Sequence, residues 1–138
     1  MADSLPIILV PGLNCSPRLY GPQAPALWGF GPVTVADHTR DASMAAIARR
    51  ILETAPPRFA LAGLSMGGYV ALEIVRQAPD RVTRLAFLDT GARDDPPAAQ
   101  ETRRSRIALA ETGRFAEVNE ATWPVLVHPD RRADVTLK

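Results

Sequence analysis

The sequence has few of the features that mark several large classes of protein. Among its 138 residues there is one cysteine, Cys15, so no disulfide forms within the chain and no thiolate cluster holds a metal. Sixteen Lys and Arg balance fifteen Asp and Glu, which leaves no excess of positive charge for a nucleic-acid backbone or an anionic membrane. We therefore expect neither kind of partner, and no metal or other cofactor.

Long apolar runs and phosphate-binding loops are also missing. The run from Ile7 to Val10 is far too short for a signal-peptide core or a membrane span, and the opening Met1-Ala2-Asp3-Ser4 has no basic residue. No G-x-G-x-x-G opens the first expected helix, and no P-loop lysine follows Gly67-Gly68. These absences favour a cytoplasmic protein that binds no dinucleotide.

Short apolar segments alternate with helical patterns along the first two thirds of the chain. Strands are expected at residues 5–10, 33–36, 59–62 and 82–88. Helices are expected at residues 44–55, capped by Asp41 or Ser43 and ended by Pro56-Pro57, and at residues 69–77 before Pro79. This alternation predicts an α/β fold with a mostly parallel sheet flanked by helices.

The pattern changes at residue 93. Helical segments are expected at residues 98–111 and 115–127, the second interrupted at Pro124, and no strand is legible after Leu88. We therefore divide the chain into a sheet-forming part, residues 1–92, and a helical part, residues 93–138.

Residues 63–67 read Gly-Leu-Ser-Met-Gly, a G-x-S-x-G motif centred on Ser65. It lies between an expected buried strand and an expected helix, where such a serine occupies a sharp, strained turn with its Oγ exposed above the sheet. A tight turn brings the flanking positions against neighbouring backbone, where a Cβ would collide. The dipole and free amides at a helix start favour a developing oxyanion. The alternative is a plain turn serine in a glycine-rich connection.

The chain resembles the α/β-hydrolase superfamily from about Leu5 to at least Arg93. Gly-Leu-Ser-Met-Gly-Gly-Tyr-Val-Ala-Leu is close to the wording of small serine esterases, enol-lactonases and cofactor-free perhydrolases of that superfamily. The first strand and Pro11-Gly12-Leu13-Asn14 look like the family's third strand and oxyanion loop, with Pro11 where histidine is common. The resemblance implies an oxyanion hole made by the Leu13 and Met66 amides. Serine at position 65, in place of aspartate, argues against dehalogenase and epoxide hydrolase chemistry.

A serine nucleophile needs a base and an acid, which follow it in that family in the order Ser, acid, His. Ser65, Asp89 and His128 satisfy this order, and Asp89 ends the strand expected beside the serine strand. Asp89 could instead shape a strand-end turn, and His128, in a helical stretch, could be a surface or lid histidine. His38 precedes the nucleophile and lies two strand positions away, roughly 10 Å at ~4.8 Å per strand.

The family domain normally continues with two more strands, which bear the acid and precede the histidine. The resemblance therefore implies an incomplete α/β-hydrolase domain, with residues 1–92 as the N-terminal part of the core and residues 93–138 as the start of a helical lid. Residues 82–88 would then be an exposed apolar edge of a parallel sheet, which proteins avoid. We expect this edge to pair with the protein's own C-terminal remainder or with another copy of the chain.

Two classes of function stay open. The leading hypothesis is a serine hydrolase that cleaves a small carboxylic ester, thioester or lactone through an acyl-enzyme on Ser65. The same turn suits cofactor-free perhydrolysis or C–C bond hydrolysis. The other class is a non-catalytic fragment or pseudoenzyme that keeps the fold as a binding or assembly module. A histidine within hydrogen-bond reach of Ser65 Oγ separates the two classes.

Overall fold

A computed structural model of the chain describes residues 4–137, which form two compact units divided between Ala92 and Arg93. Residues 1–3, on which the expectation of no leader segment partly rests, lie outside the described residues. Within residues 4–137, no helix is both long enough and apolar enough to cross a bilayer.

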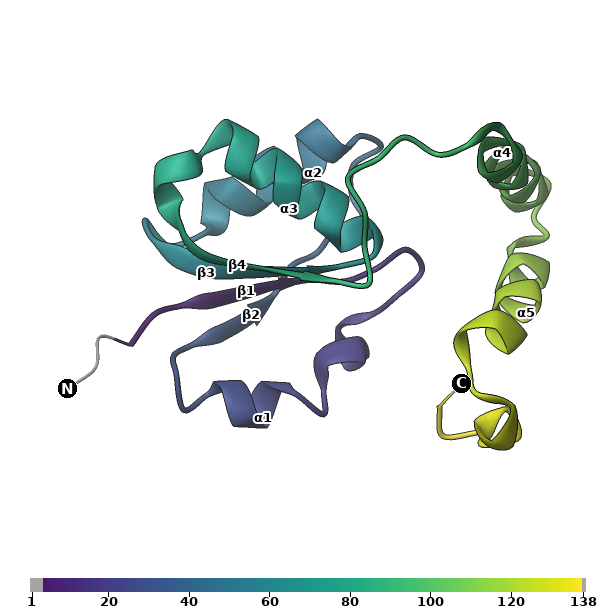
Figure 1. The fold of residues 1–138 in the computed structure, drawn as a ribbon, viewed down its shortest axis with the longest axis horizontal. Helices are drawn as coiled ribbons and strands as arrows, with labels where there is room; N and C mark the ends of the chain where they lie inside the picture. The colour runs from purple at the N-terminus through teal and green to yellow at the C-terminus, as the bar shows by residue number, and fades with distance from the viewer. Residues whose placement is uncertain (1–3, 138) are drawn as a thin grey trace. The chain divides into compact units, whose positions relative to one another are not determined.

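The first unit is built on a four-stranded parallel sheet. Its strands are β1 (Ile7–Val10), β2 (Val33–Val35), β3 (Phe59–Leu64) and β4 (Val82–Leu88), in the order β2-β1-β3-β4. The register sets Val10 opposite Gly63, and Gly63 opposite Phe87. The carboxyl ends of β1, β3 and β4 therefore meet at one end of the sheet, and the expected α/β fold is confirmed (Figure 1).

Helices cover the two faces of this sheet unequally. The helices α2 (Met44–Thr54) and α3 (Met66–Gln77) lie on one face, and α1 (Ala24–Leu27) lies on the other (Figure 1). Of the two caps considered for α2, Ser43 is the one observed, since its side chain accepts from the Ala46 amide at 3.2 Å. The single-turn helices η2 (Pro79–Arg81) and η1 (Pro17–Tyr20) complete the unit.

The short helices η1 and α1 were not expected, because proline can start a short helix as well as end a long one. Both η1 and α1 lie in what the sequence predicts as a loop, and each has a proline in its first turn. The amide that proline lacks has no intrahelical partner at that position, so its loss costs little.

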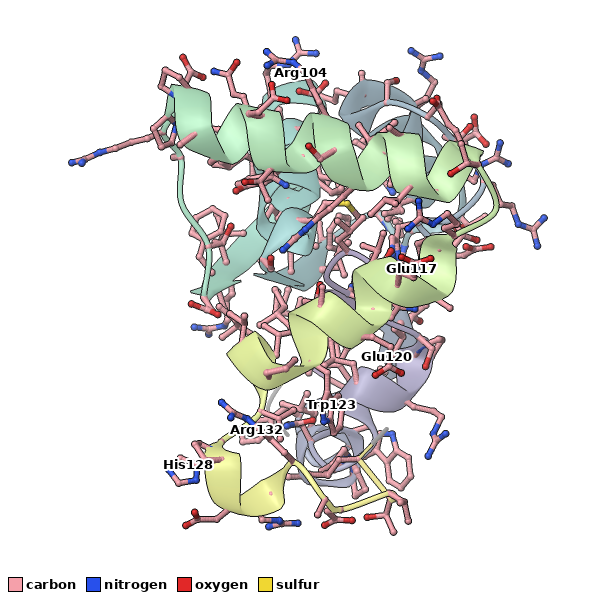
Figure 2. All side chains as sticks on the ribbon, turned by 90° about the vertical axis from the view of Figure 1, so that its right-hand side faces the viewer. Arg104, Glu117, Glu120, Trp123, His128 and Arg132 are labelled. Carbon is pink, nitrogen blue, oxygen red and sulfur yellow. The ribbon has the colours of Figure 1, made fainter. Side chains whose placement is uncertain are left out.

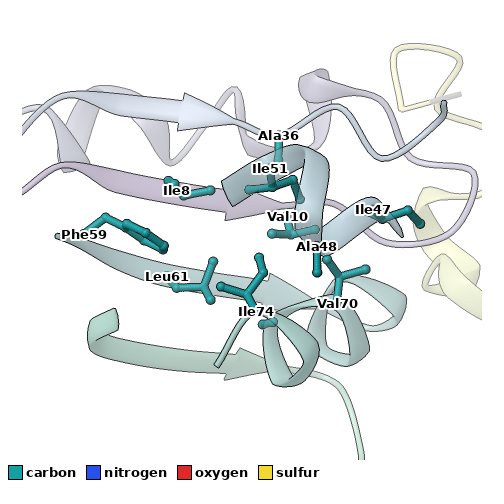
Figure 3. Packing of buried hydrophobic residues seen from close by; sticks show 11 residues of the cluster. Ile8, Val10, Ala36, Ile47, Ala48, Ile51, Phe59, Leu61, Val70 and Ile74 are labelled. Carbon is teal, nitrogen blue, oxygen red and sulfur yellow. The ribbon is translucent and has the colours of Figure 1, made fainter. Parts of the chain in front are cut away.

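The face under α2 and α3 holds the larger core. Its buried residues come from all of the first three strands or their ends and from both helices (Figure 3): Ile8, Val10, Ala36, Ile47, Ala48, Ile51, Phe59, Leu61, Val70, Ala71 and Ile74. On the opposite face only Ile7, Leu9 and Tyr20 are buried among the clustered residues. Beside them an open apolar pocket of about 370 Å³ runs across β3 to β4, lined among others by Ala86 and Leu88.

The outer edge of β4 is exposed, as expected for residues 82–88. Leu85, Phe87 and Leu88 are each about two-fifths exposed, and no strand within residues 4–137 pairs with that edge. The sheet of the first unit therefore ends on an apolar strand.

The described residues of the second unit form helices and turns. They comprise α4 (Pro97–Glu111), α5 (Phe115–Leu126) and the single turn η3 (Pro129–Arg131). The expected interruption at Pro124 is wrong, because α5 continues through it. Proline this close to a helix end removes only one backbone hydrogen bond. The end of the helix is also held by Arg132, whose side chain donates to the Pro124 carbonyl at 2.6 Å and whose carbonyl accepts from Trp123 Nε1 (Figure 2).

Candidate active site

Ser65 occupies the turn between β3 and α3 with an exposed side chain. Its backbone has φ 51° and ψ −116°, a conformation that residues other than glycine rarely adopt. Both of its peptide groups are held in place: the Ser65 amide donates to the Leu88 carbonyl at 2.9 Å, and the Ser65 carbonyl accepts from Thr90 Oγ1 at 2.7 Å. The surrounding structure therefore imposes this strained conformation on the serine.

The glycines around Ser65 are required by close backbone approach. A Cβ at Gly63 would lie 2.2 Å from the Gly67 carbonyl oxygen, and a Cβ at Gly67 would lie 2.2 Å from the Val10 carbonyl oxygen. Neither obstacle is the end of a flexible side chain, so neither can move aside cheaply. The G-x-S-x-G spacing thus follows from the packing of the turn against β1.

The loop after β1 passes beside the serine. A Cβ at Gly12 would lie 3.5 Å from Ser65 Cβ, which places the peptide that leads into Leu13 next to the turn. Met66 is the first residue of α3, so its amide is one of those without an acceptor inside the helix. The structure therefore brings both residues that the resemblance names for an oxyanion hole to the neighbourhood of Ser65.

Backbone strain is concentrated at the same end of the sheet. In the described part of the chain, three residues other than glycine have positive φ: Asn14 (59°), Ser65 (51°) and Asp89 (43°). Each follows one of the three neighbouring strands β1, β3 and β4. Such strain persists where the surrounding structure over-determines it and clusters at functional sites, so this end of the sheet is the candidate active site.

Residues 7–136 match the alpha/beta hydrolase family, which is nearly the whole chain. The chain belongs to the α/β hydrolase family. The expected fold class is confirmed by this match and by the parallel sheet flanked by helices.

Two solved structures are similar to this family member over most of its length. A thermophilic esterase from Thermogutta terrifontis is 27% identical to this chain, with a TM-score of 0.78. The match covers 96% of this chain and 54% of the esterase chain. A hydrolase from Pseudomonas aeruginosa PA01 is 22% identical, with a TM-score of 0.79, over 98% of this chain and 55% of its own. The chain spans about half the length of either structure.

Asp89 lies near Ser65 because the residues on either side of it bind the Ser65 backbone. It directly follows β4 and is exposed, and its two neighbours, Leu88 and Thr90, are the residues whose oxygens bind the Ser65 backbone. The structure therefore brings together Ser65, the turn of Asp89, and the loop of Leu13.

Neither histidine completes the site within the first unit. His38 follows β2 and is buried, and its Nδ1 has no hydrogen-bond partner among the described residues. His128 belongs to the second unit, where it precedes η3 with a side chain 73% exposed (Figure 2). Its Nδ1 accepts from the Asp130 amide at 3.4 Å, so the ring caps that turn.

Two residues that hold the candidate site lie outside the G-x-S-x-G motif and were not predicted from the sequence. Thr90 Oγ1 binds the Ser65 carbonyl, and its position directly after Asp89 at a strand end is the clue that could have suggested it. Tyr20 lies in the proline-rich stretch and donates its hydroxyl to the Val10 carbonyl at 2.9 Å. Burial raises the pKa of Tyr20, and a hydrogen bond from the Leu64 backbone lowers it by less.

Metal binding has no ready set of ligands in the described chain. Within residues 4–137 no three or more His, Cys, Asp or Glu side chains are grouped to hold an ion.

Proposed function

We propose that the protein to which this chain belongs is a serine hydrolase that cleaves a small carboxylic ester, thioester or lactone, with Ser65 as nucleophile. The observation that supports it most is the strained, exposed Ser65 turn at the start of α3. A structural turn serine has no need of a conformation that costs on the order of 1–3 kcal/mol. The family and the similar esterase support the same class of reaction.

In the proposed reaction Ser65 Oγ attacks the substrate carbonyl carbon while a base takes its proton. The negative charge that forms on the carbonyl oxygen is received by the Leu13 and Met66 amides and by the positive end of the α3 dipole. The C–O or C–S bond then breaks, the leaving group takes the proton, and water releases the acid from the Ser65 ester. Asp89 is the proposed acid if that role lies within these residues.

The base is proposed to come from the part of the protein that corresponds to the unmatched half of the similar esterase. His38 follows a strand two positions from the serine strand. His128 caps its own turn, so His128 is a weaker candidate for the base. On this view residues 93–138 are the start of a helical lid region. Perhydrolysis and C–C bond hydrolysis would use the same Ser65 adduct and stay as narrower alternatives.

Labelling with a fluorophosphonate tests the proposal on the full-length protein. We expect one label per chain, mapped by mass spectrometry to Ser65, and no label on the Ser65→Ala variant. Ser105→Ala is the matched control, because Ser105 is also exposed but lies in α4, and it should keep the label. A label on any other residue, or none on the wild-type protein, would favour the non-catalytic module.

We also propose a polypeptide partner for the exposed edge of β4, either the C-terminal remainder of the same protein or another copy. The support is the apolar edge itself, with Leu85, Phe87 and Leu88 exposed. Sedimentation of the 138-residue chain alone should show association, and Phe87→Lys should weaken it. Phe30→Lys, which alters an exposed phenylalanine away from β4, should not. A wild-type chain that stays monomeric refutes the pairing.

A further inference from the structure

Tyr20 is a buried tyrosine that the proposed reaction does not use. Only 5% of it is exposed, and its hydroxyl donates to the Val10 carbonyl oxygen at 2.9 Å. Val10 is the last residue of β1 and is fully buried. The bond joins residues ten positions apart and closes the loop that contains Leu13.

The Val10 carbonyl also borders the start of α3. A Cβ at Gly67 would lie 2.2 Å from the Val10 oxygen and 2.7 Å from the Pro11 oxygen. Gly67 directly follows Met66, so the first turn of α3 packs on the same peptide that Tyr20 holds. A movement of this peptide would change the position of the β1 loop relative to the Met66 amide.

The loop after β1 contains Pro11 and two local interactions of Cys15. Pro11 carries no amide hydrogen, so the chain cannot be held at that residue by a backbone donor. Within the loop, the Cys15 amide binds the Gly12 carbonyl at 3.2 Å and Cys15 Sγ lies 3.5 Å from the Leu13 carbonyl. These two interactions are local and stabilise the turn.

We infer that Tyr20 is a positioning residue, whose hydroxyl holds the Val10 carbonyl and thereby sets the spacing between the Leu13 and Met66 amides. This inference rests on the proposed function, since those amides are its oxyanion hole. The hydroxyl keeps its proton and remains a donor at neutral pH, since the ordinary pKa of tyrosine is about 10 and burial raises the pKa of Tyr20 further. Catalysis by two amides is sensitive to such spacing, because donors act only within hydrogen-bond distance of the developing oxyanion.

The test is Tyr20→Phe in the full-length protein, assayed on p-nitrophenyl acetate. We expect kcat per fluorophosphonate-labelled site to fall about tenfold, a smaller loss than removal of a whole oxyanion-hole donor causes, with KM changed less than twofold. Counting labelled sites removes the contribution of misfolded chains, so a merely structural role would leave kcat per site unchanged. Tyr69→Phe is the matched control, since it removes the chain's other phenol, and it should leave both constants unchanged.

A second variant separates the hydroxyl from the ring. Tyr20→Trp keeps an aromatic ring and an N–H donor beside a pocket of about 370 Å³ that can receive the larger ring, and it should recover part of the lost kcat. Equal kcat per site in Tyr20→Phe and wild type, or equal losses in Phe and Trp, overturns the inference. Ser65→Ala distinguishes the two levels: activity that survives it removes the proposed function, and this inference falls with it.

Discussion

The two faces of the sheet differ in how completely their side chains are buried. Under α2 and α3, side chains such as Val70 and Ile74 are completely buried and belong to one continuous core. Under η1 and α1, three residues are buried and an open apolar pocket runs toward β4. The candidate active site lies where the well-packed face meets the strand ends, so the serine turn rests on the more completely buried half of the unit.

Because of this difference, substitutions on the face under α2 and α3 should lower the stability of the fold more than substitutions on the other face. Close-packed interiors respond to the loss or gain of a single methylene, whereas a surface that borders empty space does not. Matched substitutions on the two faces therefore measure how far the contrast holds.

The largest contrast is expected between Ile8→Ala and Leu9→Ala. The residues are neighbours in β1 and each is 3% exposed, but Ile8 faces α2 and α3 whereas Leu9 faces the pocket. Ile8→Ala should lower the free energy of unfolding by about 4 kcal/mol and Leu9→Ala by about 2 kcal/mol, because Leu9 lines a pocket that is already open and its truncation creates less new enclosed cavity. Urea denaturation measures both, and equal losses would mean that the pocket is filled.

A smaller contrast is expected when volume is added. Ala71 in α3 is completely buried, so Ala71→Leu should cost about 1–3 kcal/mol through overpacking. Ala86 in β4 lines the pocket, so Ala86→Leu should change stability by less than about 0.5 kcal/mol. The thermal midpoints of the two variants give the comparison, and a large loss in Ala86→Leu would contradict the openness of that face.

The smallest effect concerns pH. A hydrogen bond from Arg76, with a second from Gln77, lowers the pKa of Glu73 to about 2, and Gln77 also binds the Ala45 carbonyl in α2 at 3.0 Å. A depressed carboxyl pKa stabilises the folded state above the unfolded value, and this stabilisation is lost as pH falls from about 4.5 to about 2. Glu73→Gln should therefore flatten the fall in stability across that window.

Urea midpoints between about pH 2 and pH 6 measure this effect. Glu111→Gln, at the end of α4 in the other unit, is the control and should leave the slope as in wild type. The same slope in Glu73→Gln and wild type would show that the ionised Glu73 carboxylate adds nothing to the stability of the folded state.

Most of the sheet could be predicted because its strands are short apolar runs bounded by proline or glycine. The strand at Val82–Leu88 is observed with the predicted bounds, and α3 begins three residues before the predicted Tyr69. That difference arises because Gly67 and Gly68 read as turn residues, although here their lack of a Cβ allows the helix start to pack on β1 and on Thr90.

The position of the serine turn could be predicted because one short motif carries it. Ser65 and its glycines are contiguous in sequence, so their spacing alone locates the turn. Tyr20 could not be found in this way, because its bond to Val10 depends on how η1 folds back on β1, and no periodicity encodes a side chain that binds one distant carbonyl. The base was not located for a different reason: the two histidines lie after β2 and in the second unit.

The strand order has a consequence for synthesis of the protein. The central strand β1 is made first, yet its partner β3 begins only at Phe59, about fifty residues later, so their pairing is a non-local event. At roughly 5–20 residues per second, Ile7 to Val10 would stay unpaired with β3 for several seconds of translation. The segment that later supports the serine turn therefore waits for its partner strand with four apolar side chains that the folded sheet buries.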